Sequence, residues 1–385
     1  MSWEEVQKTI KRLEDVRRDL RTLFTGRDQA IELLVLAAVC HEHLLLIGPP
    51  GTAKTGIITR FCELVDAREF HYLLSRFTEP SELFGPLDLE AFQKGTYHIR
   101  TTDMLPEAQV AFLDEVFQGS SPILNSLLAI MNERVFHNGA LRETVPLASL
   151  IGASNSIPDD PWLRAFADRF ILRIEVQPTP DDLIEDLLER GWMLERARME
   201  ATSRARGKLA VRVKIEDLLA LNLRLTEIDS ARVRPAYTRL IRELRAEGVE
   251  LSDRRVVKGL KLVHGAALLR GSDIATEQDF WPMLYVWGRP EEIEVLRNAV
   301  QPHLADEQQE RFTTVRPVSD ILLDLEMLRG QERNLTTEAA LGAHLMAINK
   351  LRRELINDHP SQTEPRRTIE EAIQNSLRTL EESHV

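Results

Sequence analysis

The chain has 385 residues, of which 43% are hydrophobic and 29% are charged, and its formal net charge is −12. This length exceeds one ordinary hydrophobic core, so we expect two or three domains of a globular protein. The acidic balance argues against a protein whose main task is to coat nucleic acid.

Neither the cysteines nor the apolar runs indicate a secreted or membrane protein. The 2 cysteines, Cys40 and Cys62, provide no disulfide framework and no metal-ligand spacing. The longest uncharged apolar run near the start, Leu33–Cys40, is too short to span a bilayer. The N-terminus is acidic and polar where a signal peptide would be basic and then apolar. We therefore expect a cytoplasmic protein without a membrane span.

The first half of the chain alternates between helical and strand patterns. Apolar residues spaced by three and four predict an amphipathic helix over residues 1–23 and a more apolar helix over Asp28–Glu42. The predicted strands that follow are His43–Ile47, Glu69–Leu74, Val110–Asp114, Ser149–Ala153 and Phe170–Val176. Between them we predict helices over Lys54–Val65, Ser121–Arg134 and Pro161–Ala167. This alternation predicts an α/β fold with a parallel sheet flanked by helices. Val135–Val145 is typical of a hairpin that turns at Asn138-Gly139.

After residue 180 the strand pattern fades, and we predict a mostly helical segment over residues 181–295 followed by a helical extension over 296–385. The extension carries two amphipathic patterns, one through Leu341, Leu345, Ile348, Leu351 and Leu355 and the other through Ile369, Ile373, Leu377 and Leu380. Leucine at helical spacing is typical of helices packed on each other or on a neighbouring domain, and the docking of a partner is the alternative. The stretch NDHPSQTEPRR between the two patterns predicts a loop.

The first predicted strand leads into GPPGTAKT, a glycine- and proline-rich loop that ends in lysine and threonine. Small residues let backbone N–H groups converge on phosphate oxygens, and the helix that follows directs its positive N-terminal end to the same place. The lysine supplies a point charge for the β- and γ-phosphates, and the threonine hydroxyl is a ligand for Mg²⁺. We therefore predict ATP binding by Gly48, Pro49, Pro50, Gly51, Thr52, Ala53, Lys54 and Thr55. The alternative is a turn with a surface lysine, but the strand before and the helix after favour nucleotide binding.

Two further predicted strands end in polar residues. VAFLDEV ends in Asp114 and Glu115, and buried charges at such a place are costly unless a cation meets them. Mg²⁺ is such a cation for Asp114, and Glu115 would then orient the attacking water. Asn155, at the end of LIGASN, could place its amide between that water and the γ-phosphate. The alternatives are an acidic turn in solvent for the carboxylates and an Asx-type turn for Asn155.

Two arginine-containing motifs have open interpretations. Arg169, in FADRF, could pair with Asp168, which the sequence alone favours, or project toward the γ-phosphate of a neighbouring subunit as an arginine finger. In LSDRR, Ser252 is a candidate N-cap for a helix. Arg254 and Arg255 are then either solvated residues of its first turn, or one of them reaches the phosphates.

In combination these motifs resemble the AAA+ ATPases, and specifically the MoxR family in its RavA-like branch. The resemblance rests on six segments in the expected order: GPPGTAKT, RFTEPSELFGPL, LPEAQVAFLDEVF, ILNSLLAIMNERVFHNG, GASN and LSDRR. It covers approximately residues 15–295, and alanine at position 53 is normal in that family.

The resemblance implies an AAA+ P-loop core with an N-terminal helix over residues 1–180, a helical lid over 181–295 and a helical C-terminal extension over 296–385. It implies a Walker A motif at Gly48–Thr55 and a Walker B motif at Asp114 and Glu115. The implied site residues are Glu115 (catalytic), Asn155 (sensor 1), Arg169 (arginine finger), Arg254 (sensor 2, swinging the lid onto the nucleotide), Thr55 and Asp114 (metal), and Phe24 and Gly26 (adenine).

The resemblance also implies a homo-hexameric ring that uses Mg²⁺ and ATP hydrolysis for chaperone-like remodelling or activation of a partner, characteristically a protein with a von Willebrand factor A (vWA) domain. The Gly85–Leu105 region and the Val135–Val145 hairpin would be insertions that face the pore of the ring. The alternative function is a nucleotide-controlled assembly scaffold or recruitment module with little turnover. A relative that translocates nucleic acid is disfavoured, because the two insertions contain few basic residues.

Overall fold

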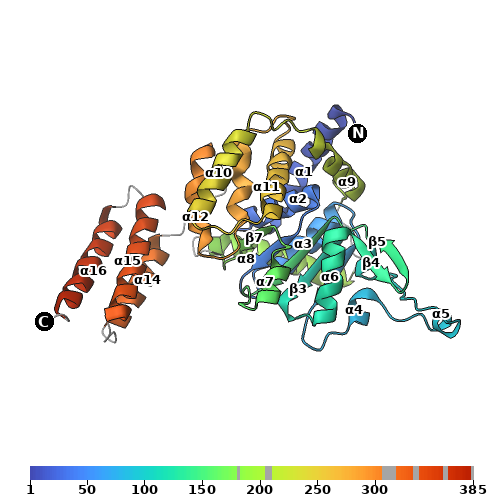
Figure 1. Cartoon of the computed structure of the whole chain (residues 1–385), viewed down its shortest axis with the longest axis horizontal. Coiled ribbons are helices and arrows are strands. Elements are labelled where there is room, and N and C mark those ends of the chain that lie inside the picture. The colour runs from blue at the N-terminus through green and yellow to red at the C-terminus, as the bar shows by residue number, and fades with distance from the viewer. Residues whose placement is uncertain (180–182, 204–209, 306–317, 333–337, 359–362, 383–385) are drawn as a thin grey trace. The chain divides into compact units, whose positions relative to one another are not determined.

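The computed structural model describes residues 1–179, 183–203, 210–305, 318–332, 338–358 and 363–382 (Figure 1). The chain divides into two compact units, Met1–Phe312 and Thr313–Val385. The first contains the sheet and most of the helices, and the second contains three helices. Among the described residues, no helix is both long and apolar enough to cross a membrane.

A five-stranded parallel sheet forms the centre of the first unit. Its strands are β1 (Leu44–Ile47), β2 (Glu69–Leu73), β3 (Val110–Asp114), β6 (Ser149–Ser154) and β7 (Leu172–Glu175). They lie in the order β2-β3-β6-β1-β7, and each adjacent pair is parallel. All residues of β1 and β6 are buried, because both neighbours in the sheet and the covering helices shield them. The predicted α/β fold is confirmed, with strand boundaries that differ from the predicted ones by two residues at most.

Helices flank this sheet as the sequence predicts. They are α2 (Asp28–Cys40), α3 (Lys54–Leu64), α6 (Ser121–Glu133) and α7 (Pro161–Ala167). The helix α1 (Trp3–Leu23) packs on two of them, α2 and α3. Ser2 caps α1 through a capping box with Glu5, and Asp160 accepts hydrogen bonds from two N–H groups at the start of α7. The apolar α2 is buried along nearly its whole length and packs against β1 and β7.

The two insertions contact each other. The first, Gly85–Leu105, follows the short helix α4 (Pro80–Phe84) and contains the short helix α5 (Leu89–Gln93). The second is the hairpin of β4 (Val135–Asn138) and β5 (Leu141–Thr144). The turn consists of Gly139 and Ala140, one residue later than predicted, because Asn138 is the last residue of β4 and pairs with Leu141. The buried Asn138 amide accepts a hydrogen bond from Ile99 N (2.7 Å) and donates one to Ile99 O (2.9 Å).

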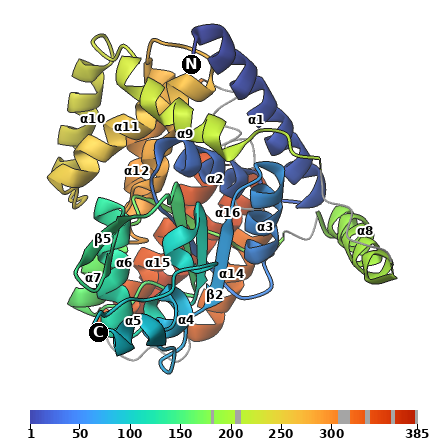
Figure 2. The same ribbon diagram turned by 90° about the vertical axis from the view of Figure 1, so that its right-hand side faces the viewer.

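The helical part of the first unit follows β7. It comprises α8 (Ile184–Ser203), α9 (Ile215–Arg224), η4 (Leu225–Glu227), α10 (Arg234–Ala246), α11 (Asp253–Leu269), η5 (Glu277–Tyr285), α12 (Glu292–Val300) and η6 (Gln301–His303). Figure 2 shows α8 projecting away from the sheet, and Arg190 on this helix donates a hydrogen bond to Arg21 O of α1 (2.8 Å). α12 continues through residue 295, where we expect the lid to end, and packs on η5. The division into core, lid and extension stays a prediction.

The second unit consists of α14 (Val318–Glu332), α15 (Glu338–Asp358) and α16 (Thr363–Glu382). Its apolar core contains residues from all three helices: Ile321, Leu325, Ile348, Leu351, Leu355, Ile369, Ala372 and Ile373. α15 and α16 correspond to the two predicted amphipathic patterns. The predicted loop is too long, because helix α15 continues to Asp358 and α16 already begins at Thr363. Residues 359–362 and the side chains of Leu377 and Leu380 lie outside the described residues.

Candidate nucleotide site

The polar residues that follow three strands meet at one edge of the sheet. Gly48 comes directly after β1, Asp114 ends β3, and Asn155 comes directly after β6. Since the strands are parallel and in register, with Ile47 opposite Ser154, their carboxyl ends form a common edge. Ligands of open α/β sheets bind at this edge. The predicted phosphate loop and the predicted Walker B and sensor 1 residues are therefore brought together.

The loop between β1 and α3 adopts a conformation that depends on small residues. Gly48 has φ +149°, and a Cβ atom there would lie 2.2 Å from the carbonyl oxygen of Val176. Gly51 also has a positive φ, +83°. Ala53 is left-handed, with φ 63°, and is the residue before α3, where it makes no side-chain cap. The start of α3 therefore keeps N–H groups available to an anion.

Lys54 folds back over this loop. Its Nζ donates hydrogen bonds to Gly48 O and Pro49 O, both at 2.8 Å, and its side chain is buried. Burial lowers the pKa of Lys54, while the charges of Asp114 and Glu115 oppose that shift. The third hydrogen bond of Lys54 Nζ goes to Thr52 Oγ1 (3.4 Å), so all three oxygens that accept from this nitrogen are neutral. A buried cation held only by neutral oxygens, next to a glycine-dependent loop, fits a triphosphate.

Asp114, Glu115 and Asn155 form a connected group. Glu115 N donates a hydrogen bond to Asp114 Oδ1 (3.0 Å), and Asn155 Nδ2 donates one to Glu115 Oε1 (3.1 Å). Glu115 is left-handed, with φ 50°, a conformation that is costly for a non-glycine residue and is frequent at functional sites. The carboxylate of Asp114 and the hydroxyl of Thr55 are oxygen donors of the type that Mg²⁺ prefers.

Phe24 lies against the first turn of α3, and Gly26 lies next to the segment after β7. The Phe24 ring packs so closely on Gly56 that a Cβ atom there would lie 3.1 Å from Phe24 Cε1. Gly26 has φ +66°, and a Cβ atom there would lie 3.5 Å from Leu183 Cδ1. The segment before α2 therefore contacts both the phosphate loop helix and the segment after β7, as a base-binding position would.

Arg27 ends the segment Phe24–Arg27 that the resemblance places around adenine, but the sequence does not predict its contacts. Its Nε donates a hydrogen bond to Thr52 O (3.1 Å), and its Nη2 donates one to Thr179 Oγ1 (3.4 Å). Burial lowers the pKa of Arg27, and its charge contributes to the lowered pKa of Lys54. In the sequence Arg27 only follows a glycine that ends a helix, so no pattern distinguishes it from an ordinary turn residue.

Arg169 lies at the opposite, amino edge of the sheet. It precedes β7, in which Leu172 is opposite Leu44 at the start of β1. The 4 residues of β1 separate this edge from Gly48, a length of roughly 13 Å that an arginine side chain does not span. The side chain of Arg169 is 28% exposed, and its Nη1 lies 3.9 Å from Asp168 Oδ2. An ion pair with Asp168 is present, but it lies near the outer limit of ion-pair distances.

Arg254 lies on α11 near Arg169. Burial lowers the pKa of Arg254, and the positive charge of Arg169 lowers it further. The same helix is attached to the amino edge, because Lys258 and Lys261 both form ion pairs with Glu42, which shortly precedes β1. In this structure α11 therefore approaches the amino edge. The expected role of Arg254 in bringing the lid onto the nucleotide stays a prediction.

Arg255 is neither a solvated residue nor directed at the phosphate loop. Its side chain is 2% exposed, its Nε donates a hydrogen bond to Asp168 Oδ1 (2.6 Å), and its Nη1 donates one to Val286 O. Ser252 caps α11 as predicted, by accepting a hydrogen bond from Arg255 N. The partner Asp168 lies 87 residues earlier in the chain, so local sequence contains no signal for this contact.

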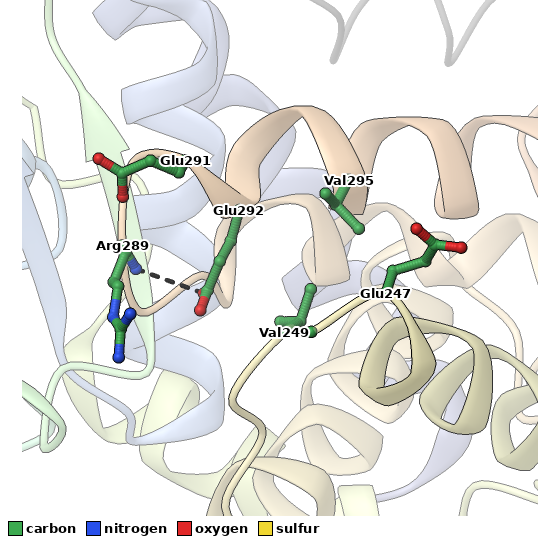
Figure 3. A pocket seen from close by; sticks show the side chains of 7 residues that line it. Glu247, Val249, Arg289, Glu291, Glu292 and Val295 are labelled. Carbon is green, nitrogen blue, oxygen red and sulfur yellow. Dashed lines mark hydrogen bonds between the residues drawn. The ribbon is translucent and has the colours of Figure 1, made fainter. Parts of the chain in front are cut away.

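A pocket in the helical part does not belong to the nucleotide site. Figure 3 shows it between the end of α10 and the start of α12, lined by Glu247, Gly248, Val249, Arg289, Glu291, Glu292 and Val295. The carboxylate of Glu292 accepts hydrogen bonds from the backbone N–H groups of Gly288 (2.6 Å) and Arg289 (3.3 Å). Glu292 thereby stabilises the turn before α12. None of the residues predicted to bind nucleotide lines this pocket.

Comparisons with known proteins agree with this geometry. A family model described as the MoxR domain in the MoxR-vWA-beta-propeller ternary systems matches residues 11–214. An uncharacterised protein of Methanocaldococcus jannaschii is 34% identical over 283 residues, which are 73% of this chain and 72% of that protein. The chaperone MoxR1 of Mycobacterium tuberculosis is 24% identical over 193 residues, which are 49% of this chain and 50% of that protein.

A solved structure shares the fold. A crystal structure from Cytophaga hutchinsonii, described as that of a candidate ATPase, has a TM-score of 0.62 and 17% sequence identity, and the match covers 78% of this chain and 95% of that one. At this identity the likeness concerns the arrangement of the elements. It agrees with an α/β AAA+ fold followed by a helical region.

Proposed function

Because the chain belongs to the MoxR family of AAA+ ATPases, we propose that it hydrolyses Mg²⁺-bound ATP at a site completed by a second copy of the chain. We further propose a homo-hexameric ring that couples this hydrolysis to remodelling or activation of a partner protein. The RavA-like branch is part of this proposal.

One copy of the chain supplies the groups that bind ATP. Residues Gly48–Thr55 cradle the triphosphate, and Lys54 exchanges its contacts with loop carbonyls for contacts with phosphate oxygens. Thr55 and Asp114 would hold Mg²⁺, which screens the phosphate charges when bound. Glu115 orients the attacking water, and Asn155 fixes the Glu115 carboxylate through its amide. Phe24 and Gly26 would contact the adenine.

The main support for the proposal is that two arginines and the phosphate loop lie at opposite edges of the sheet. Arg169 and Arg254 lie at the amino edge of the sheet, whereas the phosphate loop lies at the carboxyl edge. Two arginines near one another, one of them 28% exposed, form a positive surface that suits the phosphates of a neighbouring subunit. A ring in which the amino edge of one subunit faces the carboxyl edge of the next would complete every site.

The partner we propose is a protein with a vWA domain. Support comes from the family model, whose description places a MoxR domain in systems with vWA and β-propeller proteins. The insertions are candidate contact surfaces, because Leu89, Phe92, Tyr97 and Leu141 are exposed apolar side chains on or next to α5 and the hairpin.

An alternative is a nucleotide-controlled assembly scaffold with little turnover. The second unit, a compact three-helix bundle with its own core, favours this alternative because it could recruit a partner without hydrolysis.

Steady-state ATP turnover, measured across protein concentration together with particle mass by light scattering, separates the two functions. We expect the turnover of each subunit to rise as the chain assembles and to rise again when a vWA-domain protein is added. ATP-dependent assembly with turnover near zero would support the scaffold. Turnover that is independent of assembly would contradict the shared site.

A further inference from the structure

The segment Ala167–Phe170, which carries Arg169, is attached to the helical part of the first unit through Arg173. This arginine is on β7, is 3% exposed, and donates hydrogen bonds to Ala167 O (2.8 Å) and Phe170 O (3.3 Å), the two residues that flank Asp168 and Arg169. The same guanidinium donates a hydrogen bond to Gly288 O (2.6 Å), in the turn before α12. One side chain therefore holds both ends of the segment and also the helical part.

Asp168 makes a second, independent connection. Its Oδ1 accepts the 2.6 Å hydrogen bond from Arg255 Nε of α11, and its Oδ2 faces Arg169 Nη1 at 3.9 Å. Arg255 is fixed in place because it also binds Val286 O and is almost fully buried. The two carboxylate oxygens thus have different partners, one from the helical part and one from the segment that faces solvent.

The carboxylate of Asp168 is also the counterion of a larger positive group. Four arginine side chains interact with its charge: Arg169, Arg173, Arg254 and Arg255. The pKa of Arg173 falls to about 9, first because of burial and then because of the charge of Arg255, and the charge of Asp168 opposes this. Without Asp168, these arginines would repel one another with less compensation, so their directions would change.

We propose that Asp168 is a positioning residue through which the helical lid sets the direction of Arg169. Arg255 holds one oxygen of Asp168, and the other oxygen orients Arg169 toward the nucleotide of the adjacent subunit. A movement of α11 in one subunit is then transmitted through Asp168 to the arginine presented to the next subunit. This inference rests on the proposed shared site and adds a route by which successive sites in a ring affect one another.

The test is Asp168→Asn, which keeps the shape of the side chain and removes its charge. We expect ATP turnover to fall about tenfold, a size typical of residues that couple two sites. We expect the Kd for ATP to stay unchanged, because the phosphate loop of the same chain lies at the other edge. Mixing this variant with Glu115→Gln should restore part of the turnover, since the Glu115→Gln subunit still has an intact Asp168 and Arg169.

The matched control is Asp159→Asn, which removes a fully exposed carboxylate paired with Arg164 (2.6 Å). Asp159 lies just before α7, the helix whose C-cap residue is Asp168. We expect this control to leave turnover unchanged. Full turnover in Asp168→Asn, or an assembled mixture with no more turnover than Asp168→Asn alone, would overturn the inference.

Measuring Arg169→Ala in parallel separates the positioning role of Asp168 from the shared site. If Arg169→Ala loses turnover and Asp168→Asn does not, only the positioning role fails. If Arg169→Ala keeps full turnover, the shared site itself fails. Should Asp168→Asn not fold, Arg255→Lys carries the same test, because lysine keeps the charge but cannot bind Asp168 and Val286 together. Reduced turnover at unchanged ATP affinity is expected, and full turnover overturns the inference.

Discussion

The two edges of the parallel sheet hold their polar residues by different means. At the carboxyl edge, Lys54 binds carbonyl oxygens 5 and 6 residues away, and Glu115 binds its neighbour Asp114. At the amino edge, Arg255 reaches Asp168 from a helix 87 residues away. Phosphate binding is therefore built mainly from local backbone, whereas the arginine edge depends on how the helical part packs on the core. Changes in that packing should affect turnover more than ATP affinity.

The largest effect that separates the edges is expected from Arg169→Ala. Turnover should fall about 10³-fold or more, the usual loss when an arginine finger is removed, while the Kd for ATP stays near that of the natural chain. Turnover assays and titration with a fluorescent ATP analogue measure the two quantities. Arg164→Ala, which removes an arginine from α7 that pairs with Asp159, is the control and should change neither. Equal losses of turnover and affinity would place Arg169 in the binding site of its own chain.

The complementary change at the carboxyl edge is Lys54→Ala. Loss of a charged contact to the phosphates should weaken ATP binding by about 1.5–3 kcal/mol, or roughly ten- to a hundredfold in Kd. The exposed Lys94, at the end of α5, provides the control Lys94→Ala. Unchanged ATP affinity in Lys54→Ala would remove Gly48–Thr55 as the phosphate site.

A smaller effect concerns the stability of the amino edge. His43 is fully buried just before β1, where Leu150 N donates a hydrogen bond to its Nδ1 (3.0 Å) and its Nε2 lies 3.0 Å from Met131 O. Burial lowers the pKa of His43 well below its usual value. The unfolded chain binds a proton below about pH 6.5 that the folded chain excludes. The free energy of unfolding should therefore fall with decreasing pH, by about 1.4 kcal/mol at pH 5.5 from this residue.

Chemical denaturation at pH 7.5 and 5.5 tests this prediction. His43→Gln should have a smaller pH dependence than the natural chain, because glutamine does not titrate. His137→Gln, which changes an exposed residue of the hairpin, is the control and should keep the natural pH dependence. Identical pH dependence in the natural chain and in His43→Gln would contradict the account of this buried histidine.

The sequence predicts the carboxyl edge well because its signals are local. Apolar strands, a loop of small residues and polar residues at strand ends all lie within short segments, and parallel pairing then brings those ends together. Three residues proposed for one site, Asp114, Glu115 and Asn155, are connected by hydrogen bonds through Glu115. Their roles in hydrolysis stay predictions.

The amino edge could not be predicted in the same way. The sequence favours Asp168 as the partner of Arg169, but Asp168 lies 3.9 Å from Arg169 Nη1 and accepts a hydrogen bond from Arg255 (2.6 Å), whose position depends on how α11 packs. Arg27 and Arg173 donate hydrogen bonds mainly to backbone carbonyl oxygens. Every residue type has such an oxygen, so no residue pattern predicts these contacts. The predicted helical extension over 296–385 includes α14, but no amphipathic pattern locates this helix, because its apolar residues do not keep to one face as those of α16 do.

The central claim is that two copies of the chain build each site, and the most direct test mixes two inactive variants. Glu115→Gln keeps Arg169 but cannot orient water, and Arg169→Ala keeps Glu115 but cannot complete its neighbour. In randomly mixed rings at equal concentrations, about a quarter of the interfaces would combine both intact residues, so turnover should recover to about a quarter of its natural value. Mixed rings that form but remain inactive would contradict the shared site.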